Sequence, residues 1–188
     1  NLISKEGLGD TLNLSYDSTN RLTRFNNTAL DETYQYDAEG RRISKQSGLN
    51  TVTYLYDGLN VIQENYSSGS TNYTRNPNAP GGIGGIINQQ SPTNVPTYYH
   101  YDGLGSVTNL TNATAANTQT YSYDAFGNTI TQTGSAVNSN KFLTKQVDAS
   151  GLIYFGARYY DSRIGRFITH DPLGMVDGPN LYVYCGNN

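Results

Sequence analysis

The chain has 188 residues, a formal net charge of −3 and only 14% charged residues. No basic field is present that would hold nucleic acid or anionic lipid, and no apolar run reaches the ~20 residues of a membrane-spanning helix, so neither partner is expected. The 17 Tyr and 20 Gly, with no Trp, favour strands joined by tight turns. The composition therefore predicts an all-β chain with little helix.

A short phrase recurs along the chain. The dipeptide Tyr-Asp occurs at Tyr16-Asp17, Tyr36-Asp37, Tyr56-Asp57, Tyr101-Asp102, Tyr123-Asp124 and Tyr160-Asp161. In four copies another tyrosine stands two residues earlier, at Tyr34, Tyr54, Tyr99 and Tyr121. This spacing puts both rings of a copy on one face of a strand.

Gly or Asn follows the aspartate by three residues in most copies, as in Asp17 to Asn20 and Asp57 to Asn60. An aspartate that opens a turn accepts a local backbone N–H, and Gly or Asn at the fourth position adopts the left-handed conformation that closes a hairpin. Each phrase therefore predicts strand, turn, strand. The predicted turn residues are Asp17, Asp37, Gly40, Asp57, Asp102, Gly105, Asp124 and Gly127.

In chain order, residues 1–75 are predicted to form repeated hairpins, and residues 76–97 a Gly- and Pro-rich loop insertion. The "GGIGGI" within that loop lacks the complete spacing of a phosphate-binding loop. Residues 98–188 return to the repeat and end in an atypical segment. The single cysteine, Cys185, is expected to be a small buried residue rather than a nucleophile. His100 and His170 stand too far apart to indicate a metal site, so no metal and no cofactor are expected.

Two stretches carry a resemblance to a known family. "YYHYDGLGSVTNLT" and "GLIYFGARYYDSRIGRFITHDPLG" resemble the YD-repeat, or Rhs, family and its core-associated C-terminal region. The resemblance implies antiparallel β-hairpins wound into a spiral β-shell that encloses a C-terminal effector polypeptide. It also implies that the core region plugs the shell and acts as an aspartyl autoprotease that cuts beyond a second Asp-Pro-x-Gly-Leu motif.

The positions that match the family's reacting residues are Arg158 and Asp171. The partner aspartate and the cleavage motif are expected beyond Asn188, so the chain as given is predicted to be structural, while the longer parent processes itself. Two carboxylates can divide the roles of acid and base, which one carboxylate cannot do. Other roles stay open: Arg158 pairs with Asp161 or Asp171 for structural reasons, and the Asp171-Pro172 step suits a turn.

Three functions follow from these observations. The first is a structural segment of a β-shell that encloses, protects or displays a C-terminal toxin-like polypeptide of a secreted or surface protein, with that polypeptide and neighbouring YD-repeat segments as partners. The second is an aspartyl autoprotease core in the intact parent. The third is an extracellular module in which exposed tyrosines stack on glycans or bind a partner.

Overall fold

The computed structural model describes residues 2–7, 10–76, 78 and 85–187. Strands dominate, and within these residues the only helices are the short 3-10 turns η1 (Phe142–Thr144), η2 (Gly174–Asp177) and η3 (Cys185–Asn187). The prediction of an all-β chain built from antiparallel hairpins is confirmed. The chain divides into two compact units, Asn1–Thr51 with Asp148–Asn188, and Val52–Val147.

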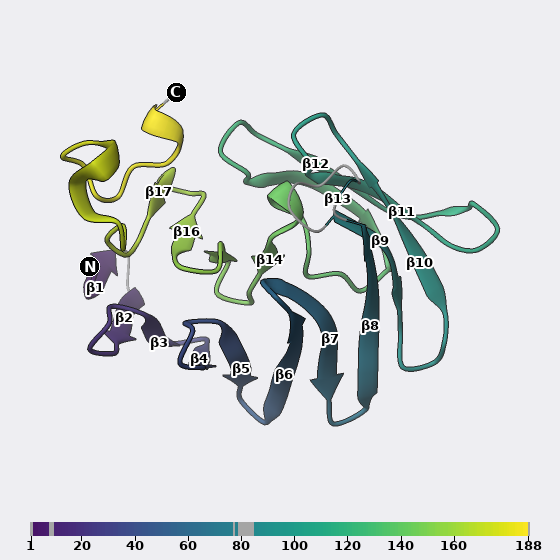
Figure 1. Cartoon of the computed structure of the whole chain (residues 1–188), viewed down its shortest axis with the longest axis horizontal. Helices are drawn as coiled ribbons and strands as arrows, with labels where there is room; N and C mark the ends of the chain where they lie inside the picture. Colours follow the sequence, from purple (N-terminus) through teal and green to yellow (C-terminus); the bar gives the residue numbers. More distant parts are fainter. Residues whose placement is uncertain (1, 8–9, 77, 79–84, 188) are drawn as a thin grey trace. The chain divides into compact units, whose positions relative to one another are not determined.

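The first unit begins with five strands, each antiparallel to the next (Figure 1). They are β1 (Ser4–Gly7), β2 (Asp10–Tyr16), β3 (Leu22–Asn26), β4 (Asp31–Tyr36) and β5 (Arg42–Ser47). The returning C-terminal segment adds β15 (Ile153–Tyr154), β16 (Tyr159–Asp161) and β17 (Arg166–Phe167). One apolar core joins hairpins and returning segment, with buried members Leu14, Leu22, Phe25, Tyr34, Leu152, Tyr154, Tyr159 and Ile168.

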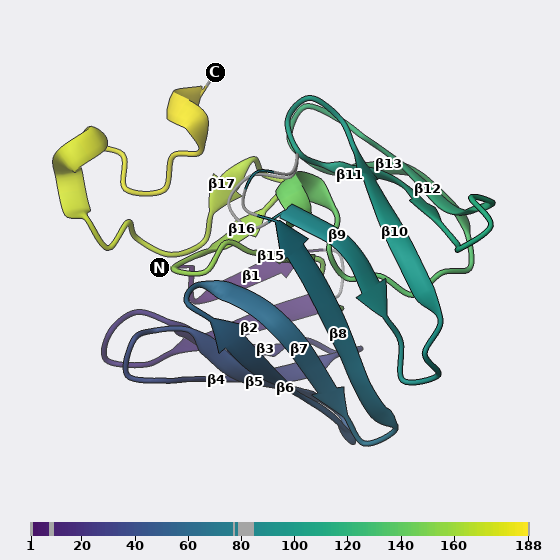
Figure 2. The ribbon, with the colours of Figure 1, turned by 45° about the vertical axis from the view of Figure 1, so that its right-hand side comes forward.

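The second unit continues the same pattern from strand to strand, as Figure 2 shows for β7 to β13. Its strands are β6 (Asn50–Asp57), which begins two residues before the unit does, β7 (Asn60–Tyr66), β8 (Gly69–Asn76), β9 (Gly85–Gln90), β10 (Pro96–Tyr101), β11 (Val107–Thr111), β12 (Asn117–Tyr123) and β13 (Thr129–Gly134). The short β14 (Gln146–Val147) ends it. Its core is formed by Tyr73, Ile86, Tyr99, Val107, Leu110 and Tyr121.

The predicted loop over 76–97 is corrected in part. Gly85–Gln90 form β9, which pairs with both β8 and β10, and Ile86 is fully buried. The glycines and prolines therefore flank a strand. Its formation depends on burial of Ile86 against residues that are distant in the sequence, such as Leu110 and Tyr121. Residues 77 and 79–84 of the predicted loop lie outside the described residues. The segment after Val147 packs on the first hairpins and belongs to the first unit.

Four of the Asp-initiated turns share one geometry. Asp17, Asp37, Asp102 and Asp124 each accept, at Oδ1, the backbone N–H groups of the residues two and four positions later. The residue three positions after the aspartate donates its N–H to the aspartate carbonyl and has a positive φ, from +64° at Asn20 to +87° at Gly105 and Gly127. Asparagine thus replaces glycine where only the backbone conformation matters.

The turn after Asp57 differs from its prediction. Asp57 is the last residue of β6 and pairs with Asn60, so Gly58 and Leu59 alone form the loop. Gly58 takes the positive φ of +57°, and Asn60 begins β7 instead of closing the turn. The reason is local: glycine directly after the aspartate supplies the left-handed conformation early enough for a two-residue hairpin.

The tyrosine before the aspartate bonds to the neighbouring strand. Tyr16, Tyr36, Tyr101 and Tyr123 donate their hydroxyls to the carbonyl oxygens of Leu2, Leu22, Ile86 and Val107 over 2.6 to 2.8 Å. We call this the tyrosine–carbonyl contact. Burial raises the pKa of Tyr101 to about 12, so its hydroxyl stays protonated and remains a donor.

Candidate functional site

The two residues matched to the family's reacting positions form an ion pair in the first unit. Arg158 Nη1 lies 2.8 Å from Asp171 Oδ2, and the guanidinium carbon lies 3.6 Å from the centroid of the Phe167 ring. Both side chains line a cavity of about 400 Å³, together with Phe155, Phe167, Val183 and Tyr184. We call it the Arg158 cavity. A charge-assisted bond and stacking on an aromatic ring hold the guanidinium in one orientation.

Asp171 also opens a turn. Its Oδ1 accepts the backbone N–H of Leu173 at 2.9 Å, and its carbonyl accepts the N–H of Gly174 at 3.0 Å. One carboxylate therefore makes both contacts that the sequence offers as structural explanations. Asp161, the other proposed partner of Arg158, pairs with Arg163 instead, at 2.8 Å.

Four aromatic rings form a cluster, and three of them, Phe155, Phe167 and Tyr184, line the cavity. Phe155, Tyr160, Phe167 and Tyr184 contact one another at centroid distances from 4.4 Å, between Tyr160 and Tyr184, to 5.9 Å. Burial and the adjacent Cys185 raise the pKa of Tyr184. Cys185 itself is exposed and has a φ of +47°, which corrects the expectation of a buried cysteine. Tyr184 turns into the ring cluster, and its neighbour in the short turn η3 faces outward.

The histidines lie apart. The ring of His100 contacts the hydroxyl of Thr111 in the second unit, and the ring of His170 packs against Tyr182 in the first. Among the described residues no group of three or more His, Cys, Asp or Glu is placed to hold a metal ion. Those residues also contain no helix that is long and apolar enough to cross a membrane.

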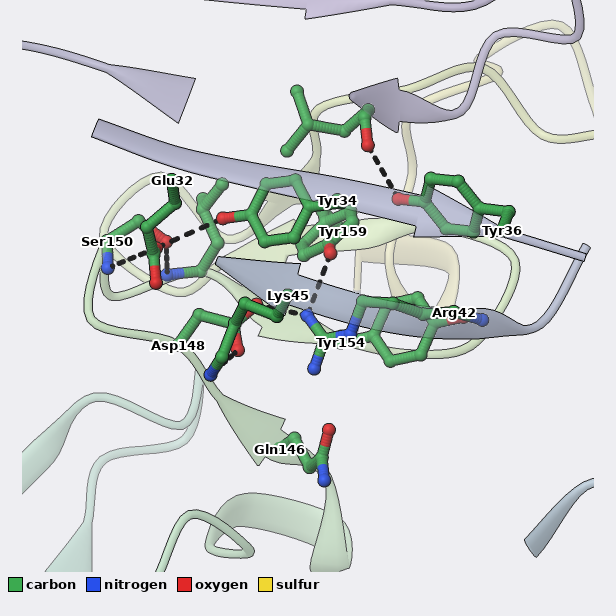
Figure 3. A network of polar contacts seen from close by, with 12 residues as sticks. Glu32, Tyr34, Tyr36, Arg42, Lys45, Gln146, Asp148, Ser150, Tyr154 and Tyr159 are labelled. Atoms are coloured by element: carbon green, nitrogen blue, oxygen red, sulfur yellow. Dashed lines mark hydrogen bonds and ion pairs between the residues drawn. The ribbon is translucent and has the colours of Figure 1, made fainter. Parts of the chain in front are cut away.

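A buried charge network, formed by Glu32, Arg42, Lys45 and Asp148, lies where the returning segment meets the hairpins of the first unit (Figure 3). Arg42 Nη1 and Lys45 Nζ, both from β5, contact the two oxygens of Asp148 at 2.5 and 2.8 Å. Burial alone would raise the pKa of Asp148, but the two cations hold it below its usual range. The charged carboxylate is therefore the stable form.

The same network holds two further parts of the returning segment. Glu32 Oε2 accepts the backbone N–H of Ser150 at 3.0 Å and the hydroxyl of Tyr34 at 3.1 Å. Arg42 Nη1 also donates to the hydroxyl of Tyr159 at 2.9 Å, and the backbone N–H of Arg42 donates to the hydroxyl of Tyr154 at 3.1 Å. Figure 3 shows the Tyr159 hydroxyl bonded to the Arg42 side chain, and Glu32 bonded to Ser150 at the left of the view.

Sequence reasoning missed this network, although a signal was present. In the strand register, the residue opposite the phrase tyrosine is aliphatic in three copies, as Leu22, Val61 or Val107. It is Thr129 in the copy at Tyr123 and Arg42 in the copy at Tyr36. A fully buried arginine thus takes a position that three other copies give to an aliphatic side chain. The first tyrosines of the phrase, Tyr34, Tyr54, Tyr99 and Tyr121, are also buried, so they form no exposed sugar-stacking platform.

The fold is that of a segment found in bacterial toxin complexes. No family model matches the chain. The crystal structure of TcdB2-TccC3-Cdc42 is similar with a TM-score of 0.76 and 23% identity, over 94% of this chain and 10% of that one. A Photorhabdus luminescens Tc holotoxin pore carrying a TccC3 mutation has a TM-score of 0.73 and 22% identity, with the same coverage.

Several relatives are toxins or a nuclease by name. The tRNA nuclease WapA of Bacillus subtilis (strain 168) is 31% identical over 187 residues, which cover 93% of this chain. Toxin subunit YenC1 of Yersinia entomophaga is 31% identical over 205 residues, 93% of this chain and 21% of that protein. Double-stranded DNA deaminase toxin A of Burkholderia cenocepacia is 27% identical over 222 residues, 100% of this chain and 16% of that protein. The chain spans 8% of the length of WapA.

Proposed function

We propose that the chain is a segment of a YD-repeat (Rhs) protein whose hairpins form part of a β-shell, and that this shell encloses and protects a toxin-like polypeptide outside the cell that makes it. The observation that carries the proposal is the repeated tyrosine–carbonyl contact, which joins successive hairpins within each unit. The burial of the first tyrosines supports a wall rather than a ligand platform.

The relatives support the toxin-related part of this proposal. The tRNA nuclease and the DNA deaminase toxin differ in activity by name, yet each contains a stretch similar to this chain. A stretch shared by proteins of different activity fits a common carrier better than it fits either chemistry. The partners are then the enclosed polypeptide and neighbouring repeat segments. The protein is then secreted or lies at the cell surface.

Protease protection tests enclosure. In the longer protein that contains this chain, the polypeptide following the repeat region should resist digestion under native conditions. A variant whose wall is opened, Gly134→Val, should expose it, because a Cβ at Gly134 would lie 2.2 Å from the carbonyl oxygen of Thr118. Gly40→Ala, where a Cβ meets nothing within 4 Å, is the matched control. Equal digestion of the following polypeptide in the wild-type protein and in its separately expressed form would refute enclosure.

A second function is favoured by one observation, the Arg158–Asp171 ion pair at a cavity. We propose that these residues belong to an autoprocessing site in the longer protein, in which Asp171 acts with a second carboxylate supplied from elsewhere and Arg158 stabilises negative charge. Asp171→Asn should abolish release of the C-terminal polypeptide on a gel. Asp161→Asn, which alters another ion-paired turn aspartate, should leave release intact. Unchanged release in Asp171→Asn would exclude the assignment.

A further inference from the structure

We propose that Arg42 is a positioning residue, which sets the register of the returning segment on the hairpins and thereby places Arg158 opposite Asp171. The inference rests on the proposed autoprocessing function for the meaning of that placement. Arg42 lies more than one hundred positions before the segment that it orients.

Arg42 takes a position of the repeat that holds an aliphatic residue in three other copies. Arg42 lies opposite Tyr36 in the strand register, as Leu22 lies opposite Tyr16 and Val107 opposite Tyr101. Those two aliphatic residues are buried in the cores of their units. An apolar side chain at this position would pack without a desolvation cost, whereas a buried guanidinium needs a counter-charge. The exchange is thus not required to build a hairpin.

The side chain of Arg42 bonds to two separate parts of the returning segment. The Arg42 guanidinium contacts Asp148, and its Nη1 also donates to the hydroxyl of Tyr159. The two acceptors stand eleven residues apart in the returning segment, one before β15 and one on β16. Because one guanidinium nitrogen donates to both groups, the two acceptors must lie close to the same point of β5, which fixes the alignment of this segment. A shift by two residues would keep the same face of a strand buried, so the alternation of apolar side chains alone does not exclude it.

The position of Tyr159 also determines the position of Arg158, the residue before it, which lines the cavity. Tyr159 faces the hairpins, where its ring packs 5.2 Å from those of Tyr34 and Tyr154. Neighbouring residues on a strand point to opposite faces, so Arg158 and Tyr160 face away from the hairpins. There Tyr160 joins the ring cluster and Arg158 stacks on Phe167. Fixing Tyr159 on one face therefore fixes Arg158 on the other.

The best-attested role of a buried ionic group is to specify one register among several, often without a gain in stability. The structure fits that role, because Lys45 adds a second cation to Asp148 and Glu32 holds Ser150 two residues further on. The contacts of Arg42, Lys45 and Glu32 thus hold the returning segment in the same register at Asp148, Ser150 and Tyr159.

The test uses the longer protein and compares Arg42→Leu, Asp148→Asn and the double variant Arg42→Leu/Asp148→Leu. The control Arg24→Leu removes an exposed ion pair of strand β3 in the same unit. Hydrogen exchange is measured on peptides covering residues 146–161 and on peptides covering β9 to β12, and release of the C-terminal polypeptide is followed on a gel.

Both single variants are expected to speed exchange in 146–161 at least tenfold, to leave β9 to β12 unchanged and to slow release. The double variant is expected to recover thermal stability and still to show fast exchange and slow release, because the charges are gone but the register is not restored. Unchanged exchange in the single variants, or full recovery of exchange and release in the double variant, would overturn the proposal. If Arg42→Leu does not fold, Asp148→Asn decides the same comparison.

Failure of the two proposals can be told apart. Release that persists in Asp171→Asn would refute autoprocessing, while the exchange measurements would still show whether Arg42 holds β16. Loss of release in Asp171→Asn together with unchanged exchange in the Arg42 and Asp148 variants would keep autoprocessing and remove the positioning role.

Discussion

Arg75 donates its Nε–H to the carbonyl oxygen of Val61 at 2.6 Å, the contact that a tyrosine hydroxyl makes in other hairpins. Tyr73-Thr74-Arg75-Asn76 at the end of β8 is therefore a copy of the Tyr-x-Tyr-Asp phrase in which arginine and asparagine replace its last two residues. Asn76 keeps the turn bond, accepting the backbone N–H of Asn78 at Oδ1 over 2.9 Å.

The first prediction follows from this substitution. Arg75→Tyr should retain or raise the free energy of unfolding, because it restores the donor used elsewhere and removes a partly buried charge whose pKa is lowered by burial. Arg75→Ala should lower it by about 1–3 kcal/mol, since the Val61 carbonyl loses its donor. Chemical denaturation measures both. A larger loss for Arg75→Tyr than for Arg75→Ala would contradict the equivalence.

The tyrosine–carbonyl contact gives the second prediction. Tyr36→Phe removes only the hydroxyl that donates to Leu22, so the free energy of unfolding should fall by about 0.5–1.5 kcal/mol. Tyr98→Phe, at a half-exposed tyrosine on β10, serves as the control and should have little effect. Equal losses in the two variants, measured by thermal denaturation, would show that the hydroxyl contact contributes nothing.

Two turn glycines separate backbone strain from crowding. Gly40→Ala forces a φ of +83° on a residue with a Cβ but meets no atom within 4 Å, so we expect a cost of about 1–2 kcal/mol. Gly127→Ala has a similar φ of +87° and also places its Cβ 2.5 Å from Phe142 Cδ1. It should cost clearly more, since the buried ring must move. Midpoints of thermal unfolding that shift equally would argue against this crowding.

The fourth prediction concerns acid. A carboxyl whose pKa is lowered in the folded state stabilises the fold above its unfolded pKa, and this contribution is lost as the pH falls through the folded value. The pKa of Asp148 is lowered against the opposing effect of burial, by Arg42 and Lys45. Stability should therefore fall below a pH of about 4, the usual aspartate range.

Asp148→Asn should be less stable at neutral pH and show a shallower fall of the unfolding midpoint between pH 4 and pH 2. Asp31→Asn, which breaks the exposed pair with Arg24, should change the profile little, because solvent screens that pair. A profile for Asp148→Asn that parallels the wild type would show that this carboxyl does not control acid stability.

Local signals in the sequence were enough to predict the strand-turn-strand units, because a turn depends on residues that are close together in the chain. The copy at Arg75 has neither the tyrosine nor the aspartate of the phrase, and it is equivalent to the others only because the strand needs no more than a donor that reaches the next carbonyl. The two-residue turn at Asp57 shows the same limit: the position of one glycine changes the loop length.

The candidate site could be predicted only in part. Resemblance selected Arg158 and Asp171, and the structure brings their side chains together, but their roles in a reaction stay a prediction. The buried charge network could not be found from local patterns, since Arg42 and Asp148 meet only after the segment beyond Val147 has returned to the first hairpins. The one local signal for the network was Arg42 itself, a charged residue at a position that is aliphatic in three other copies of the phrase.

The tyrosine–carbonyl contact has a consequence for how such a chain can change over generations. The acceptor is a backbone oxygen, present whatever side chain the residue carries, so Leu2, Leu22, Ile86 and Val107 serve equally. A point mutation at the acceptor cannot remove the contact, and a duplicated or exchanged hairpin finds a receptive neighbour wherever it is inserted. A series of such hairpins can therefore gain or lose members and change in sequence while neighbouring hairpins remain joined.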